Sequence, residues 1–183
     1  MNDELSQIRS RVQDAFLPGE FISMRREIGE AARMDAIDLE LLCSIGAPRI
    51  GEREIEFNLL NALPTLRELT LDRFPPSADW PMELICFNDK YDFVYGLDNR
   101  EGGNVKCVDL SGESHGVIFI NSNLRSMIGF AAECRLHTNR CQASDTSYED
   151  SFEEALAWMS QLDPDGGASE WWQAVFEDMN TFL

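Results

Sequence analysis

The chain has 183 residues, of which 44% are hydrophobic and 26% are charged, so it holds enough apolar material for one domain with its own core. Its 15 Lys and Arg residues stand against 33 Asp and Glu residues, and the formal net charge is −18 at pH 7. Because such a surface repels phosphate groups, we expect neither nucleic acid nor an anionic membrane among its partners.

The first third of the chain shows helical patterns. One amphipathic helix is predicted before Pro18, from apolar residues spaced by three and four. These residues are Leu5, Ile8, Val12 and Phe16. A second helical pattern runs over 24–42, and Gly46 and Pro48 follow it as breakers. The segments 50–59 and 63–76 leave strand and short helix both open.

Four strands are predicted next, joined as a meander over about 82–121. The expected strands cover 82–89, 91–98, 104–110 and 117–121. Gly102 and Gly103 permit the positive φ angles of a hairpin between two of them. Alternation of Tyr91, Phe93 and Tyr95 with smaller or polar residues predicts a half-buried strand. The run 117–120 is apolar at every position, so we expect this strand in the centre of the sheet.

Helical patterns return after the last strand. An amphipathic helix is expected over 123–136, with Asn121 or Ser122 as its N-cap. Two more helices are expected over 148–162 and 169–182, separated by the helix-breaking run DPDGG. The order of elements predicts a single α+β domain over 1–183. Its antiparallel or mixed twisted sheet has a central meander flanked by helices, and its C-terminus is helical.

Several residue sets invite a catalytic or metal-binding interpretation, and we favour a structural role for each. Gly112–Gly116 matches G-x-S-x-G, but a strand follows where a nucleophile elbow needs a helix. Cys134, His137 and Cys141 share a helix side but lack a fourth ligand for zinc. The acids near strand ends are expected to cap turns rather than act as acid–base pairs; they are Asp89, Asp92, Asp98 and Asp109. We therefore predict no catalytic, cofactor or metal site.

The cysteines favour a reducing compartment. Five of them form an odd set without short framework spacing, and Cys86 and Cys107 lie in apolar strand-like runs. The first ten residues contain acids and no apolar run, so we expect no signal peptide, and no stretch approaches the length of a membrane span. The expected location is the cytoplasm.

The end of the chain is its most acidic part. No Lys, Arg or His follows Arg140, whereas ten acids lie between Cys141 and Leu183. This part also carries Trp171 and Trp172, and because neighbouring helix residues point about 100° apart, one Trp is expected in the core and one partly exposed. A basic protein would be attracted to such a surface at a raised association rate.

Short motifs along 40–180 resemble the SUKH superfamily, in particular the bacterial SUKH-type immunity proteins of polymorphic toxin systems (the fourth subgroup). An early helix with a Gly-x-Pro break corresponds to 41–48, and the central meander and its strand-to-helix junction correspond to parts of 95–124. The motifs are Leu41-Leu42-x-x-Ile45-Gly46-Ala47-Pro48, Phe57, Leu63–Leu66, Tyr95–Asp98, Val108-Asp109, Phe119–Leu124 and Trp171-Trp172. The N-terminal helix, within residues 1–25, lies outside the resemblance.

The resemblance implies a non-enzymatic, monomeric protein that binds and neutralises a cognate secreted toxin, for example a basic nuclease domain. The family supplies no fixed binding residues, so we predict the contact from charge and aromatic content. The predicted partner-binding residues are Glu149, Asp150, Glu153, Glu154, Glu170, Trp171 and Trp172. The alternative is a type III secretion chaperone, which is also small and acidic but usually dimerises and holds an extended effector segment.

Overall fold

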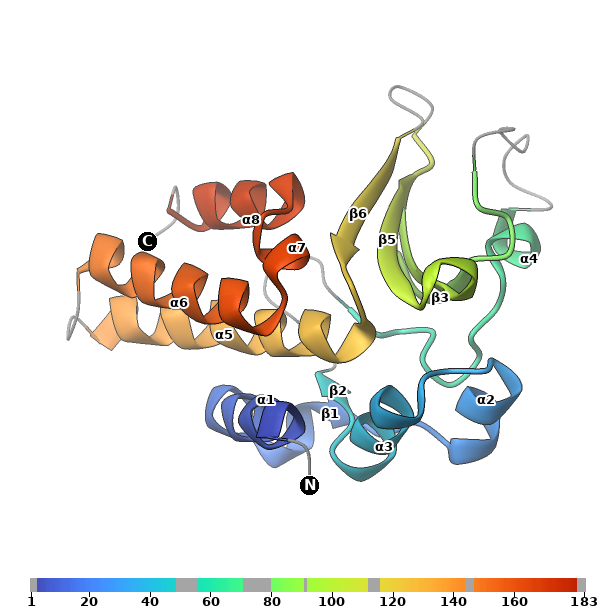
Figure 1. The fold of residues 1–183 in the computed structure, drawn as a ribbon, viewed down its shortest axis with the longest axis horizontal. Helices are drawn as coiled ribbons and strands as arrows, with labels where there is room; N and C mark the ends of the chain where they lie inside the picture. The colour runs from blue at the N-terminus through green and yellow to red at the C-terminus, as the bar shows by residue number, and fades with distance from the viewer. Residues whose placement is uncertain are drawn as a thin grey trace.

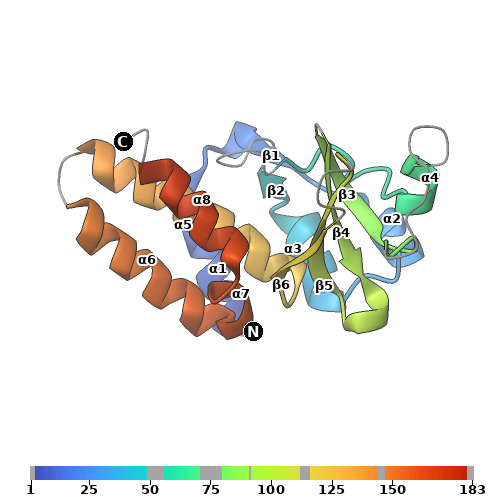
Figure 2. The ribbon, with the colours of Figure 1, turned by 90° about the horizontal axis from the view of Figure 1, so that it is seen from above.

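The computed structural model describes residues 3–48, 56–70, 80–90, 92–111, 116–143 and 147–180. It confirms the predicted α+β class, with an antiparallel sheet, helices around it and a helical C-terminal part (Figure 1). Seen from above, the sheet occupies one side of the molecule and helices α5, α6 and α8 occupy the other (Figure 2). None of the described helices is both long and apolar enough to cross a membrane.

The predicted meander is confirmed as a four-stranded antiparallel sheet in the order β3-β4-β5-β6. Its strands are β3 (Ile85–Lys90), β4 (Phe93–Asp98), β5 (Asn104–Asp109) and β6 (Val117–Asn121). The short helix η3 (Asn99–Glu101) and two glycines with φ of +76° and +87°, Gly102 and Gly103, connect β4 to β5. Only glycine adopts these angles readily, which explains the Gly-Gly pair in the hairpin.

Two predictions about the sheet are wrong. Strand β4 is buried on both faces rather than half-buried, because a second apolar cluster around Leu66, Trp80 and Leu84 covers Val94 on the far side. Strand β6 is an edge strand rather than a central one, and Val117 and Ile118 are 37% and 38% exposed. An apolar run on both faces is typical of a central strand, but at this edge it leaves apolar side chains in solvent.

The helical part is built around α5 (Leu124–Ala143), which starts beside β6 and is buried along much of its length. Helix α1 (Asp3–Ala15) packs on one side of it through Leu5, Ile8 and Val12, as the spacing predicted. The C-terminal helices cover the other side (Figure 1). They are α6 (Tyr148–Leu162), α7 (Pro164–Gly167) and α8 (Glu170–Asn180).

The helix predicted over 24–42 is two helices, α2 (Arg26–Ala31) and α3 (Ala36–Ser44). Arg33 takes a left-handed φ of 56°, which ends the first helix, and Asp35 caps the second by accepting from the Ile37 N–H. Two short strands flank this pair of helices in the chain and pair with each other. Strand β1 (Phe21–Ile22) follows the short helix η1 (Pro18–Glu20) and precedes α2, and β2 (Ala47–Pro48) follows α3. For the segments 50–59 and 63–76 the sequence left strand and short helix both open. The segment 63–76 contains α4 (Leu66–Thr70), and residues 50–55 lie outside the described ranges.

The N-terminus of α5 is capped differently from the prediction. Asn123 accepts from the Ser126 N–H at 2.9 Å, in place of Asn121 or Ser122. Asp38, from the distant helix α3, accepts from the backbone N–H groups of Leu124 and Arg125, both at 3.3 Å. A carboxylate at this position satisfies free N–H groups and complements the helix dipole.

Asn121 and Ser122 instead bind Asp163, which lies between α6 and α7. The Asp163 carboxylate is 3% exposed and accepts from the Asn121 side chain at 3.0 Å and from the Ser122 N–H and hydroxyl at 2.8 Å. It also accepts from the Gly166 N–H at 3.1 Å, which caps α7. One buried carboxylate thus joins the end of β6 to the C-terminal helices.

Replacing this carboxylate should destabilise the fold strongly. Asp163→Ala leaves four donors without their acceptor, and we expect the free energy of unfolding to fall by about 3 kcal/mol or more. Urea unfolding followed by circular dichroism measures this loss. The matched control is Asp165→Ala, two residues away and exposed on α7, which should change stability by less than about 0.5 kcal/mol. Equal stability of the two variants would contradict the proposed role of Asp163.

Candidate functional site

The acids of α6 project away from the core. Ser151, Ala155 and Met159 form the buried stripe of the helix. The four predicted contact residues on the helix are therefore exposed; they are Glu149, Asp150, Glu153 and Glu154. Asp150 also takes part in the helix cap, since the Ser147 hydroxyl accepts from its N–H at 3.1 Å and donates to its carboxylate at 2.9 Å.

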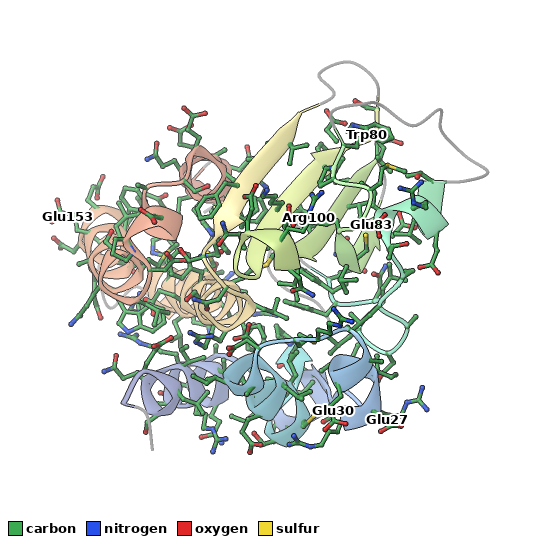
Figure 3. The ribbon with its side chains drawn as sticks, turned by 45° about the vertical axis from the view of Figure 1, so that its right-hand side comes forward. Glu27, Glu30, Trp80, Glu83, Arg100 and Glu153 are labelled. Carbon is green, nitrogen blue, oxygen red and sulfur yellow. The ribbon has the colours of Figure 1, made fainter. Side chains whose placement is uncertain are left out.

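Helix α8 brings a further acid to this end of α6. The Tyr148 hydroxyl donates to the Phe176 carbonyl at 3.0 Å, which places the exposed Glu177 near Glu149. Burial raises the pKa of Tyr148, and the nearby charges of Glu149 and Glu177 raise it further. We call the exposed residues Glu149, Asp150, Glu153, Glu154 and Glu177 the acidic end. Figure 3 shows Glu153 on the side of the molecule away from the sheet.

Three acids on α6 lack, among the described residues, the cationic partners that many other acids of the chain have. Arginines pair with the acids of the N-terminal half; the pairs include Glu4–Arg125, Glu20–Arg135, Glu40–Arg26 and Glu83–Arg67. Within the described ranges, Glu149, Glu153 and Glu154 have no cation within 4.0 Å. The first turns of α6 therefore present three carboxylates without a cationic partner in the described part of the chain.

The structure separates the other predicted contact residues from the acidic end. Glu170 and Trp171 begin α8 beside the sheet, where the Trp171 ring stacks edge-to-face on Tyr95 with centroids 5.7 Å apart. Helix α6 alone is about 22 Å long, so these residues and the acids in its first two turns form two surfaces rather than one. Glu170 is exposed and Trp171 is partly exposed.

Trp172 does not belong to either surface. Its side chain has no exposed area, packs against Phe130 with ring centroids 5.2 Å apart, and donates from Nε1 to Asn121 at 3.0 Å. The expectation that one Trp is core and the other partly exposed is confirmed. The inclusion of Trp172 among the partner-binding residues is wrong, because a fully buried ring offers no surface to a partner.

Sequence reasoning missed a groove on the face of the sheet that points away from α5. It has a volume of about 580 Å³ and lies beside β6. Trp80, Val117 and Phe119 supply its apolar walls, and Asp98, Arg100 and Lys106 supply its polar part. Figure 3 shows Trp80 and Arg100 on this side of the molecule, away from Glu153. The pairing of Lys106 with Phe119 across β5 and β6 creates this surface. The sequence predicted the strands but not their register, so it did not predict the groove.

Asp98 holds the polar part of the groove together. Its side chain is 2% exposed, and it accepts from Arg100 Nε at 3.0 Å, Arg100 Nη2 at 3.1 Å and Lys106 Nζ at 3.1 Å. The hydrogen bonds from Arg100, supported by Lys106, lower the pKa of Asp98 from 3.8 to about 2 against the opposing effect of its burial. It also accepts from the Arg100 N–H at 3.1 Å, which confirms the predicted turn-capping role.

The Cys134, His137 and Cys141 set is part of a buried polar network. The Ser151 hydroxyl lies 2.9 Å from His137 Nδ1 and accepts from Arg140 Nε at 2.9 Å. Arg140 also pairs with the fully buried Glu133 at 2.7 Å. Burial, followed by the charge of Arg140, lowers the pKa of His137. Among the described residues, no group of His, Cys, Asp or Glu is arranged to hold a metal ion. Residues 112–115 of the G-x-S-x-G match lie outside the described ranges.

Comparison with known proteins does not assign the chain to a family. No family model, no curated protein and no solved structure matches it. The resemblance to SUKH-type immunity proteins therefore stays a prediction.

The low pKa of Asp98 predicts a specific pH dependence of stability. Because the folded-state pKa of about 2 lies below the ordinary 3.8, ionised Asp98 stabilises the fold above about pH 4, and this contribution is lost as the pH falls through 2. Asp98→Asn should reduce the free energy of unfolding by about 1 kcal/mol at pH 6. The difference from the original chain should shrink between pH 4 and pH 2, as measured by urea unfolding.

The matched control for this titration is Glu30→Gln, which changes an exposed carboxylate on α2. Its effect on stability should stay within about 0.5 kcal/mol at pH 6. A deficit of Asp98→Asn that is the same at pH 6 and pH 2.5 would contradict the charge-based role of Asp98.

Proposed function

We propose that this chain is a binding protein that neutralises a basic protein partner by covering part of its surface. The motifs that resemble SUKH-type immunity proteins favour a secreted toxin as that partner, with a basic nuclease domain as the best match in charge. On this proposal the chain transforms no substrate, and its function lies in the shape and charge of its surface.

The acidic end is the observation that carries this proposal. Three of its carboxylates, those of Glu149, Glu153 and Glu154, have no nearby cation in the described ranges. Their negative potential accelerates the encounter with a basic surface. The same carboxylates can occupy the phosphate-binding groove of a nuclease and so compete with its substrate. Their exposed position on the first two turns of α6 keeps them accessible to a folded partner.

The use of polar groups inside the fold also supports a binding role. Asp163 and Asp38 accept from helix N–H groups, and Glu133 is paired with Arg11 at 2.9 Å and with Arg140. His137 is engaged by Ser151. These groups have structural partners, which leaves the exposed carboxylates on the first turns of α6 as the stronger candidates for function.

The open edge of β6 favours a second candidate, a type III secretion chaperone that holds an extended effector segment. Its two apolar, exposed residues, Val117 and Ile118, are of the kind that such a segment can pair with. The two functions differ in oligomeric state, because chaperones of this class usually dimerise.

The mass in solution separates these candidates. We expect size-exclusion chromatography with light scattering to give a monomer of 20.8 kDa at micromolar concentration. A monomer is expected because the net charge of −18 opposes self-association. A stable dimer across a dilution series would favour the chaperone and contradict the immunity proposal in its present form.

Charge reversal tests the acidic end directly. The triple variant Glu149→Lys, Glu153→Lys and Glu154→Lys leaves the Ser147–Asp150 cap intact. We expect it to lower the association rate with the cognate basic toxin domain by at least tenfold at low salt, because electrostatic attraction raises that rate. The difference should shrink at high salt, where charges are screened. Stopped-flow kinetics measures the association rate at each salt concentration. Co-expression with the toxin domain shows whether the variant still rescues growth.

The matched control reverses three exposed acids on the opposite side, Glu27, Glu30 and Glu83, and changes the net charge by the same amount (Figure 3). This control variant should retain most of the association rate and should still rescue growth. If both triple variants lose activity equally, total charge rather than the acidic end attracts the partner. If neither does, the acidic end is not part of the interface.

A further inference from the structure

The two edges of the sheet differ in how their backbone groups are covered. At the β3 edge, the segment 56–64 supplies partners: the Cys86 N–H donates to the Pro64 carbonyl at 2.8 Å, and the Asp89 N–H donates to the Asn58 side chain at 3.1 Å. At the β6 edge, the Ser169 hydroxyl donates to the Phe119 carbonyl at 2.9 Å. Helices α7 and α8 therefore cover the end of β6 that leads into α5, and within the described ranges no hydrogen bond covers the outer side of its other end.

The hydrogen-bond pattern shows which backbone groups the open end presents. The Gly116 carbonyl accepts from the Asp109 N–H at 3.1 Å, so Gly116 is directed toward β5. Because the direction alternates along a strand, Ile118 is also directed toward β5, and Val117 and Phe119 are directed away from it. The Ser169 bond to Phe119 agrees with this assignment. The N–H and C=O of Val117 thus face the open edge, and we call 116–118 the open half of β6.

Apolar side chains flank the open half of β6 on both faces of the sheet. On one face, Val117 and Phe119 line the groove together with Trp80. On the other face, Ile118 continues the row that pairs Tyr95 with Cys107, and Trp171 stacks on Tyr95 in that row. A strand added at this edge would therefore find apolar contacts for side chains that alternate between the two faces.

We propose that the open half of β6 binds an extended segment of the basic partner, and that this segment combines apolar and cationic residues. The segment pairs its backbone with Val117 and places alternate apolar side chains in the groove and against Ile118 and Trp171. This inference rests on the proposed function and adds a second contact to the acidic end.

Charge decides between the possible occupants. The exposed acids Asp165 and Glu170 lie on α7 and α8, the helices that cover the rest of the β6 edge, so cationic residues in the segment are attracted to them. A second copy of this chain would bring two net charges of −18 together through a short stretch of backbone pairing, which is unfavourable. A cationic, extended segment is therefore the occupant that this edge favours.

An eight-residue peptide of alternating lysine and valine is a suitable probe. We expect it to bind the full chain, to change the fluorescence of Trp171 and to slow hydrogen exchange of the Val117 amide. Val117→Pro removes the outward N–H without removing a β5 hydrogen bond, and edge strands tolerate proline. This variant should bind the peptide at least tenfold more weakly in isothermal titration calorimetry.

Ile118→Ser provides a second test that leaves the backbone unchanged, and it should also weaken binding several-fold. The matched control is Leu17→Ser, which removes an apolar side chain that is 72% exposed but distant in the chain from β6. It should bind the peptide like the original chain. A peptide N-methylated at alternate amides keeps its charge and should bind at least tenfold more weakly, because it cannot complete the pairing.

Equal binding of the plain and N-methylated peptides, or of Val117→Pro, Ile118→Ser and the original chain, would overturn the proposal. Dimerisation of the chain that Val117→Pro abolishes would overturn it too, in favour of a second copy at this edge. The charge-reversal variant of α6 keeps the outcomes distinct. If that variant loses neutralisation while the peptide fails to bind, the proposed function stands and the edge site does not.

Discussion

Two buried carboxylates hold the start of α5 from opposite sides, and the arrangement of the molecule depends on them. Asp38 reaches from α3 to the N–H groups of Leu124 and Arg125, and Asp163 reaches from the end of α6 to Asn121 and Ser122. Together they join the N-terminal helices, the sheet and the C-terminal helices at one junction. Free N–H groups at the start of a helix bind carboxylates well, so the junction is a favourable place for such contacts.

This junction carries an energetic cost as well as a benefit. Burial raises the pKa of Asp38, and the charge and hydrogen bonds of Arg125 offset part of that effect. Arg125 in turn pairs with Asp38 at 3.0 Å and with Glu4 at 2.8 Å, which connects α1 to the same point. Buried charges of this kind are tolerated only with partners on every side, so the residues around the junction depend on one another.

The junction also sets the distance between the two surfaces proposed for binding. Helix α6 runs from the acidic end to the sheet side, and α8 returns along it from Glu170 beside β6 to Phe176 beside Tyr148. The acidic end and the open half of β6 therefore lie at opposite ends of the C-terminal helices. A partner that touched both would have to span about the length of α6, roughly 22 Å, which suits a folded domain with one extended segment.

The sequence alone was sufficient for the local structure: the α1 stripe, the four strands of the meander, the Gly102-Gly103 hairpin and the excess of acids after Arg140. These features follow from periodicity, turn residues and charge, which are properties of neighbouring residues. Only the tertiary structure decided that β6 is an edge strand, that Trp172 is core, and that Asp38 and Asp163 hold α5. Each of these depends on contacts between residues far apart in the chain, such as Trp172 with Asn121, and local patterns do not encode which distant segments meet.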